Sequence, residues 1–210
     1  SNLAHSNIII TPLSYNKNLY KPDVQNPILH IAEKYEIKKP YLFYIGRLEK
    51  KKNINNIIEA FKIFNKDNPD YSLVLAGSKG AGWENLQFKV QNSKLKILNW
   101  VPDKDVPHLM ASAEIFLYPS LYEGFGIPIL EAMASGTPVI TSSCASMPEV
   151  AGDAALLINP NNPQEIAETI QRIINNPSLK QDLIQKGLIR CKQFSWEKCA
   201  EQTLHQMLKS

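Results

Sequence analysis

Cysteine, histidine and long apolar runs are all scarce in this sequence. Its three cysteines are an odd set without Cys-x-x-Cys spacing, which fits a reducing cytoplasm better than a disulfide scaffold. Its four histidines stand apart, and no cluster of His, Cys and Asp has metal-ligand spacing, so we expect no bound metal. No apolar run approaches the ~20 residues that cross a bilayer, and a signal-peptide pattern is absent. These absences predict a cytoplasmic protein whose membrane contact, if any, is peripheral.

Charge is also low. The net charge is +3 and the lysines are scattered along the 210 residues, which argues against a nucleic-acid partner. No G-x-G-x-x-G follows a first strand with a ribose-binding acid downstream, so a nicotinamide-binding fold is disfavoured. Hydrophobic residues, by contrast, make up 44% of the chain, which excludes disorder and supplies a core for one large or two small domains.

The most informative stretch joins a buried strand, a glycine loop and a helix. Ile115–Tyr118 is apolar throughout and predicts a strand. Pro128 suits the first position of a helix, where a missing N–H costs nothing. Gly136 suits the left-handed residue just past a helix end. The pattern predicts a helix at about 127–135 whose N-terminus faces the loop at 123–126.

This loop has the chemistry to bind a phosphorylated sugar. The first amides of a helix lack partners and carry partial positive charge, and glycine lets a ligand approach the backbone. Glu123 and Glu131 flank that point, and carboxylates accept hydrogen bonds from paired sugar hydroxyls. An ordinary joint with surface acids is the simpler alternative, but two acids and two glycines at this spacing favour binding. The residues predicted to meet a ligand through their backbone are Gly124, Phe125, Gly126 and Ile127.

The same residues resemble a known family signature. The run reads Pro119-Ser120-x-x-Glu123-Gly124-Phe125-Gly126-x-Pro128-x-x-Glu131-Ala132-Met133-Ala134-x-Gly136-x-Pro138-Val139. It is similar to the signature of the retaining GT-B glycosyltransferases of group 1 (glycosyltransferase family 4). The resemblance implies that the two glutamates hold a nucleotide-sugar donor, with Glu123 facing the sugar and Glu131 the ribose.

A cationic turn follows another buried strand, at 41–45. Gly46 ends this strand, and Arg47 and Lys52 stand where a phosphate would lie. Arginine can fork onto phosphate oxygens and lysine acts as a point charge. We predict that both neutralise a departing diphosphate, a task that other enzymes give to a metal, whereas the other two lysines of the turn are solvated. The family's Gly-Arg-Leu, with a lysine five residues after the arginine, matches this turn and implies that the pair holds the donor's diphosphate.

Three weaker signals also come from the resemblance. Gly77, after a predicted strand at 72–76, resembles the family's second glycine turn, which lines the donor pocket. Val101 lies in a segment that resembles the one whose backbone contacts the nucleobase. The Pro-Glu pair at 148–149 resembles a further family element, but Cys-Ala-Ser at 144–146 replaces the glycines that often precede it. That departure removes the basis for expecting a sugar contact from this loop.

Strands and helices alternate along the chain with short links. This order predicts an α/β, Rossmann-like fold, with a mostly parallel sheet, helices on both faces and a helical C-terminal tail. Ligands of such sheets collect at the carboxyl ends of the strands, where Gly46, Gly77 and the Glu123 loop lie. The predicted strands are 7–11, 41–45, 72–76, 96–98, 115–118, 138–141 and 155–158. The predicted helices are 28–35, 53–64, 83–91, 103–112, 127–135, 147–150, 163–174, 177–192 and 195–208, with Asp103 and Ser195 as caps.

The resemblance also divides the chain, as one lobe of a two-lobed GT-B enzyme. Residues 1–22 are expected to be a hinge-proximal segment with the first strand, 23–194 the nucleotide-sugar-binding domain, and 195–210 a helix that crosses to the other lobe. The apolar face of that helix is then exposed; the alternative is that it packs on the sheet. The chain begins with Ser-Asn rather than Met, so we expect a cut or tagged piece that lacks the acceptor-binding lobe.

The sequence therefore predicts the donor-binding half of a retaining, metal-independent glycosyltransferase. The resemblance implies transfer of a hexose, of mannose or glucose type, from a GDP- or UDP-sugar to a glycan or lipid-linked acceptor. Arg47, Lys52 and Glu123 are then the catalytic residues, and the piece alone is expected to bind donor weakly and turn over nothing. Two alternatives remain open: a non-catalytic nucleotide- or phosphosugar-binding module, and half of a related GT-B phosphorylase or epimerase. The intact acid and cation pairs argue against a decayed site.

Overall fold

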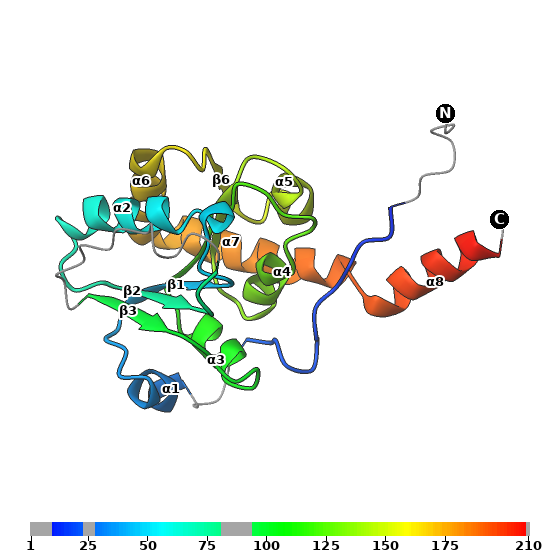
Figure 1. Ribbon diagram of the computed structural model, residues 1–210, viewed down its shortest axis with the longest axis horizontal. Coiled ribbons are helices and arrows are strands. Elements are labelled where there is room, and N and C mark those ends of the chain that lie inside the picture. Colours follow the sequence, from blue (N-terminus) through cyan, green and yellow to red (C-terminus); the bar gives the residue numbers. More distant parts are fainter. Residues whose placement is uncertain (1–9, 23–27, 81–93, 209–210) are drawn as a thin grey trace.

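A computed structural model describes residues 10–22, 28–80 and 94–208 (Figure 1). Its strands are β1 (Tyr41–Ile45), β2 (Ser72–Ala76), β3 (Leu95–Leu98), β4 (Ile115–Tyr118), β5 (Val139–Ser142) and β6 (Leu156–Ile158). Its helices are α1 (Ile28–Lys34), α2 (Ile54–Asn65), α3 (Val106–Ala111), α4 (Ile127–Ala134), α5 (Met147–Ala151), α6 (Pro163–Ile174), α7 (Pro177–Arg190) and α8 (Trp196–Met207), with 3₁₀ turns η2 (Lys50–Lys52) and η4 (Cys191–Gln193).

The described strands form one parallel sheet in the order β3-β2-β1-β4-β5-β6. Helices α2 and α6 pack together on one side of it, and α1 and α3 pack together on the other (Figure 1). The predicted Rossmann-like α/β fold is confirmed. The strand order reverses between β1 and β4, and in such sheets a ligand binds beyond the carboxyl ends of the strands at that point.

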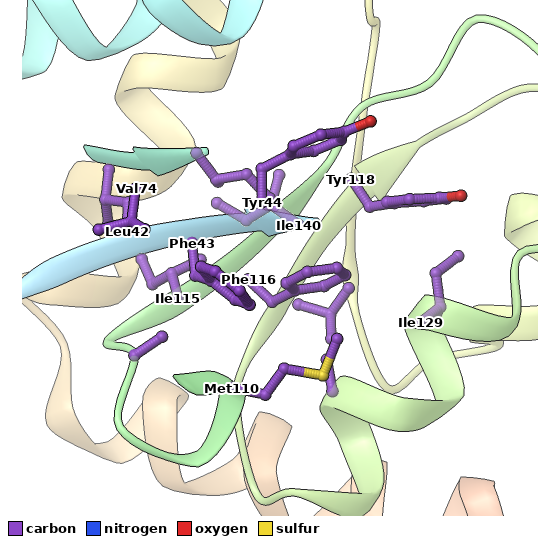
Figure 2. Packing of buried hydrophobic residues seen from close by; sticks show 14 of the residues in the cluster. Leu42, Phe43, Tyr44, Val74, Met110, Ile115, Phe116, Tyr118, Ile129 and Ile140 are labelled. Carbon is purple, nitrogen blue, oxygen red and sulfur yellow. The ribbon is translucent and has the colours of Figure 1, made fainter. Parts of the chain in front are cut away.

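The two strands at this reversal carry an aromatic core. Strands buried on both faces are apolar throughout, and here the rings of Phe43 and Phe116 lie 6.2 Å apart (Figure 2). The rings of Tyr44 and Tyr118 stack with centroids 6.3 Å apart, and both side chains are fully or almost fully buried. The Tyr44 hydroxyl donates to the Arg47 carbonyl, 3.0 Å away. The core therefore extends to the loops that follow these strands.

Gly46 and Gly77 allow two strand ends to approach closely. Both have positive φ, of 148° and 139°. The Gly46 amide donates to the Ala76 carbonyl at 3.0 Å, and a Cβ added to Gly77 would lie 1.9 Å from the Gly46 oxygen. Real Cβ atoms do not come that close to backbone, so Gly77 is required by packing whether or not a ligand binds.

Most element boundaries agree with the sequence predictions, and most of the differences are small. Helix α4 begins at Ile127 as predicted, but Pro128 is its second residue rather than its first. Gly136 follows with φ 75°, as expected. Helix α7 ends at Arg190, where η4 takes over. The helix predicted at 83–91 lies outside the described residues.

The prediction that Asp103 caps a helix is wrong. Helix α3 starts at Val106, three residues later. The preceding Asp105 does not cap it either, because its carboxylate accepts hydrogen bonds from Lys34 Nζ at 2.5 Å and from the Tyr35 hydroxyl at 2.6 Å. Asp105 therefore ties the end of α1 to the start of α3.

The described residues before α1 and helix α8 come together away from the sheet (Figure 1), where the Cys199 thiol donates to the Thr11 carbonyl at 3.9 Å. The predicted strand at 7–11 falls largely outside the described residues, and its described part, 10–11, is not in a strand. At the other end the Ser195 side chain caps α8 as predicted, accepting from the Lys198 amide at 3.0 Å. Helix α8 projects from the body, and Leu204 and Leu208 are 58% and 79% exposed. Exposure of its apolar face is confirmed and packing on the sheet is wrong. No described helix is both long and apolar enough to cross a membrane.

Candidate functional site

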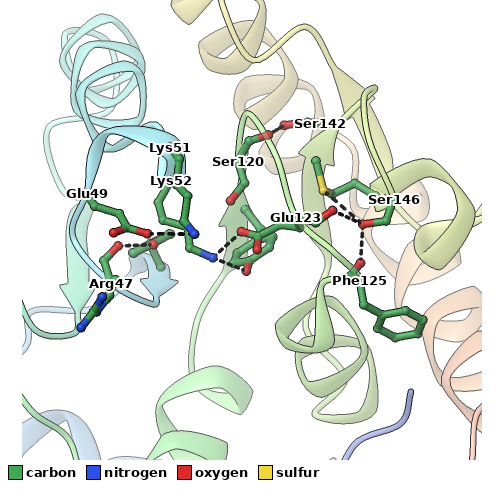
Figure 3. A network of polar contacts seen from close by, with 12 residues as sticks. Arg47, Glu49, Lys51, Lys52, Ser120, Glu123, Phe125, Ser142 and Ser146 are labelled. Atoms are coloured by element: carbon green, nitrogen blue, oxygen red, sulfur yellow. Dashed lines mark hydrogen bonds and ion pairs between the residues drawn. The ribbon is translucent and has the colours of Figure 1, made fainter. Parts of the chain in front are cut away.

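An ion pair joins the two loops at the point where the strand order reverses. Lys52, at the end of η2, pairs through Nζ with Glu123 Oε1 in the loop after β4 (Figure 3). The Lys52 ammonium also donates to the Tyr118 hydroxyl at 3.3 Å and lies 5.5 Å from the centre of that ring. The two charged side chains are only 13% and 12% exposed. The structure thus brings together two residues that the sequence placed in separate motifs.

The ion pair leaves Lys52 able to hold an anion as well. An ammonium group has three N–H donors. Glu123 and Tyr118 accept two of them, and no group of the described residues accepts the third. Glu123 compensates the cost of burying the lysine charge before any ligand arrives. A phosphate oxygen could therefore bind Lys52 without breaking its contact with Glu123.

Arg47 is not part of this pair. Its side chain is exposed, and in Figure 3 its guanidinium points away from Glu123. An exposed arginine changes rotamer readily on binding, so Arg47 reaches the ion pair only by such a movement. Lys51 contacts Glu49 at 3.4 Å and is 60% exposed, which confirms the prediction of a solvated lysine there.

Sequence reasoning missed the part that Asn53 has in the site. Asn53 is buried, has left-handed φ of 62°, and does not cap α2 with its side chain. Its Nδ2 instead donates to the Pro119 carbonyl at 2.9 Å and to the Pro160 carbonyl at 2.6 Å. The Leu121 amide donates to the Lys51 carbonyl at 2.9 Å nearby. These bonds fasten the two functional loops together; the only signal for them was an asparagine, a residue that tolerates left-handed backbone.

The glycine loop presents open backbone. A Cβ added to Gly124 would meet nothing within 4 Å. Among the described residues, no group accepts a hydrogen bond from the amides of Gly124, Gly126 or Ile127. The Phe125 ring packs edge-to-face against Phe194 with centroids 5.9 Å apart, so this residue can offer a ligand only its backbone. The start of α4 is therefore free to bind an anion or hydroxyl groups.

Glu131 lies one turn into α4 and is half-buried. Burial raises its pKa to about 7, a hydrogen bond from the Tyr20 hydroxyl lowers the pKa in part, and the charge of Asp103 raises it. Tyr20 belongs to the segment before the sheet, and burial beside Glu131 raises its own pKa as well. No motif in the sequence indicated this tyrosine, because it comes to Glu131 only through the tertiary fold.

The sequence matches a family of known enzymes. Residues 28–190 match the family model described as glycosyl transferases group 1.

The chain belongs to this family.

It is similar to the O-antigen chain mannosyltransferase B of Escherichia coli, with 37% identity over 204 residues that cover 94% of this chain and 53% of the relative. It is also similar to the crystal structure of the C-terminal domain of a group 1 glycosyl transferase from Francisella tularensis. That likeness has a TM-score of 0.76 and 25% identity, and it covers 86% of this chain and 97% of the other.

An Anabaena protein solved in complex with UDP-glucose has the same fold, with a TM-score of 0.81 at 21% identity over 94% of this chain and 56% of the other. This chain thus spans about half the length of the mannosyltransferase and of the Anabaena protein. The recognised GT-B glycosyltransferase family is confirmed, and the chain is a domain of that family.

The remaining predicted residues of this group 1 glycosyltransferase lie around the same sheet edge. Val101 follows β3 with a buried side chain, so only its backbone is available to a nucleobase, while its neighbour Trp100 is 76% exposed. Sequence analysis also missed a hollow of about 430 Å³ beside the glycine loop; its lining includes Gly124, Ser146 and Glu149. No group of three or more His, Cys, Asp or Glu side chains within the described residues could hold a metal.

We expect donor affinity to rise with pH through about 7. The family signature implies that Glu131 holds the ribose; an ionised carboxylate can accept hydrogen bonds from two hydroxyls, whereas the protonated acid offers fewer lone pairs. Affinity for a nucleoside diphosphate, measured by calorimetry between pH 6 and 8, should therefore increase in the wild type and be low and flat in Glu131→Gln. An equal pH dependence in both proteins would assign the titration to another group.

The same carboxyl group changes folding stability in the opposite direction. Its pKa in the folded state, about 7, is above the ordinary value of 4.5, so the folded chain holds this proton more tightly than the unfolded chain. The contribution of Glu131 to the free energy of unfolding therefore falls as pH rises from about 4.5 to about 7 and is constant above that. At pH 8, Glu131→Gln should be more stable than the wild type by at most roughly 3 kcal/mol in urea unfolding.

Proposed function

We propose that this chain is the donor-binding lobe of a glycosyltransferase that transfers a hexose from a nucleotide diphosphate sugar. The observation that carries the proposal is the Lys52–Glu123 ion pair beside the open start of α4. A cation, a carboxylate and free amides at one point match the phosphate and hydroxyl groups of such a donor. Glu131, one turn further along α4, adds an acceptor for the ribose.

Each group has a role that follows from its position. Lys52, joined by Arg47 after a rotamer change, neutralises the charge that gathers on the leaving diphosphate. Glu123 accepts hydrogen bonds from hydroxyls of the transferred sugar while it orients Lys52. The amides of Gly124, Gly126 and Ile127 hold the phosphate or sugar oxygens between them. Because these groups supply the charge that a metal would otherwise bring, we propose a metal-independent reaction.

The family supports a finer proposal. We assign a retaining reaction, as the signature implies, and a mannose- or glucose-type donor, because one similar protein carries the name mannosyltransferase and one with the same fold was solved with UDP-glucose. The base, UDP or GDP, is a matter for experiment. A second lobe would bind the glycan or lipid-linked acceptor, residues 1–22 would lead from it, 23–194 would bind the donor, and 195–210 would return to it. We place the reaction in the cytoplasm.

The test is calorimetric titration of this chain with UDP, GDP and ADP, without added metal. We expect one of the three to bind, and we expect Glu131→Ala to abolish that binding because the ribose loses its carboxylate. Glu201→Ala, the same change on exposed α8, is the control and should bind as the wild type does.

Weak binding by the lobe alone calls for the same titration on the two-lobed enzyme. Absence of binding to every nucleotide there, or unchanged binding in Glu131→Ala, would overturn the proposed function. Binding without turnover in that enzyme would favour a non-catalytic binding module.

A further inference from the structure

The loop before α5 holds the glycine loop by its main chain. Ser146 Oγ donates to the Glu123 carbonyl at 3.0 Å and to the Phe125 carbonyl at 2.8 Å (Figure 3). One hydroxyl thus shares its proton between two carbonyl groups that are two residues apart, in a three-centre bond. Ser146 comes from the loop in which Cys-Ala-Ser, at 144–146, replaces the glycines of the family pattern.

These two bonds fix the direction of two amides. A trans peptide group is planar, and its C=O and N–H point in opposite directions. The Glu123 carbonyl shares a peptide group with the Gly124 amide, and the Phe125 carbonyl shares one with the Gly126 amide. Because both carbonyls point to Ser146, both amides point away from it. They are two of the three loop amides that donate to no group among the described residues.

The Glu123 side chain agrees with this arrangement. In Figure 3 its carboxylate reaches toward Lys52 while its carbonyl reaches toward Ser146, on the opposite side of the backbone. Without a fixed carbonyl, glycine at 124 and 126 would allow both peptide groups to rotate, since glycine lacks the Cβ that restricts other residues. A flexible loop would have to be ordered when ligand binds, at a cost in affinity.

We infer that Ser146 is a positioning residue that turns the Gly124 and Gly126 amides toward the donor's phosphate and sugar oxygens. The inference rests on the proposed function, because it needs a donor at the start of α4. It is compatible with the expectation that this loop makes no direct sugar contact, because Ser146 acts through the glycine loop and does not contact the donor itself.

The same sheet edge supplies a matched control. Ser142 Oγ also donates to a main-chain carbonyl of the β4–α4 loop, that of Ser120, at 2.6 Å. That bond lies at the base of the loop and involves neither glycine peptide. Ser142→Ala and Ser146→Ala therefore remove the same kind of bond from the same loop, but only Ser146→Ala allows the Gly124 and Gly126 peptide groups to rotate.

The test compares ligand binding and amide resonances of the chain. The probes are UDP-glucose or GDP-mannose, whichever base binds in the titration above, and the matching nucleoside, uridine or guanosine. We expect Ser146→Ala to move the Gly124 and Gly126 amide resonances even without ligand, and to weaken nucleotide-sugar binding about tenfold. Nucleoside binding should change less than about twofold, since the base and ribose sit elsewhere. Ser146→Thr, which keeps the hydroxyl, should bind nucleotide sugar nearly as the wild type does.

The outcomes separate this inference from the proposed function. Wild-type amide resonances and affinity in Ser146→Ala, while Glu131→Ala still loses binding, would overturn the positioning role alone. Equal losses in Ser142→Ala and Ser146→Ala, or equal losses for nucleotide sugar and nucleoside, would show a general loosening of the loop and would also overturn it. If the two-lobed wild type binds no nucleotide, the proposed function fails first.

Discussion

Lys52→Ala should lower turnover of the two-lobed enzyme by about 10²- to 10³-fold, the usual cost of removing one donor that stabilises charge in the transition state. The lysine is fixed before the donor arrives, by Glu123 and by Tyr118 at 3.3 Å, so no other cation can readily take its place. Arg47 is exposed and points elsewhere in the free protein (Figure 3). Initial rates with saturating donor and acceptor measure the effect, and near-normal turnover would contradict the role assigned to Lys52.

The same substitution leaves Glu123 buried without its partner, so stability must be measured beside turnover. We expect a loss on the order of 3 kcal/mol in the free energy of unfolding. Adding Glu123→Gln removes the unpaired charge and should restore part of that stability while turnover stays low. Lys50→Ala is the matched control in the same turn, because this lysine is exposed. Its turnover should stay within about twofold of the wild type, and its free energy of unfolding within ~0.5 kcal/mol.

Gly77→Ala should destabilise the protein by about 3 kcal/mol or more. The new Cβ would lie 1.9 Å from the Gly46 carbonyl oxygen, in a backbone with φ 139° that side chains rarely adopt. Neither group can move without separating the ends of β1 and β2, because the Gly46 amide is bonded to the Ala76 carbonyl. Urea unfolding monitored by circular dichroism measures the loss. A stability within ~1 kcal/mol of the wild type would show that the two strand ends are less tightly packed than described.

Gly124→Ala makes the same chemical change in the neighbouring loop with the opposite result. Nothing lies within 4 Å of the added Cβ, and Gly124 is exposed, so stability should change by less than ~0.5 kcal/mol. We expect donor affinity to fall about tenfold instead, because the methyl group enters the space through which a ligand reaches the amides. The two alanine variants therefore separate the glycine that packing requires from the glycine that a ligand requires. Unchanged donor affinity in Gly124→Ala would contradict the assigned approach to the backbone.

The hydrogen bonds of Ser146 could not be predicted from the residue types of its loop. The sequence lacks the glycines expected before Pro148 and Glu149, and that departure removed the basis for expecting a direct sugar contact from this loop. The structure gives the loop a different part, as a hydrogen-bond donor to the carbonyls of Glu123 and Phe125. Both hydrogen bonds run from a side chain to main-chain carbonyls. Every residue has a main-chain carbonyl, so the residue types at 123 and 125 give no sign that Ser146 will bond there.

Local patterns determined the fold class and the elements that carry the site. The apolar runs at 41–45 and 115–118 predict buried parallel strands because only strands covered on both faces are apolar throughout. The alternation with helices then places the loops after them at one edge of the sheet. Glu123 and Lys52 were therefore expected at the same edge from the sequence alone, as were the left-handed Gly136 and the helix start at Ile127.

Only the tertiary structure decided which of these groups touch one another. The sequence paired Lys52 with Arg47, whereas the fold pairs it with Glu123, which is 71 residues away in the chain. It likewise partly buries Glu131, which raises the pKa of that carboxyl to about 7, and it brings Tyr20 to Glu131, whose hydrogen bond lowers the pKa in part. Hydrogen bonds of this kind depend on distances of a few tenths of an ångström between residues remote in sequence, and those distances are set by packing of the whole sheet and its loops rather than by any local propensity.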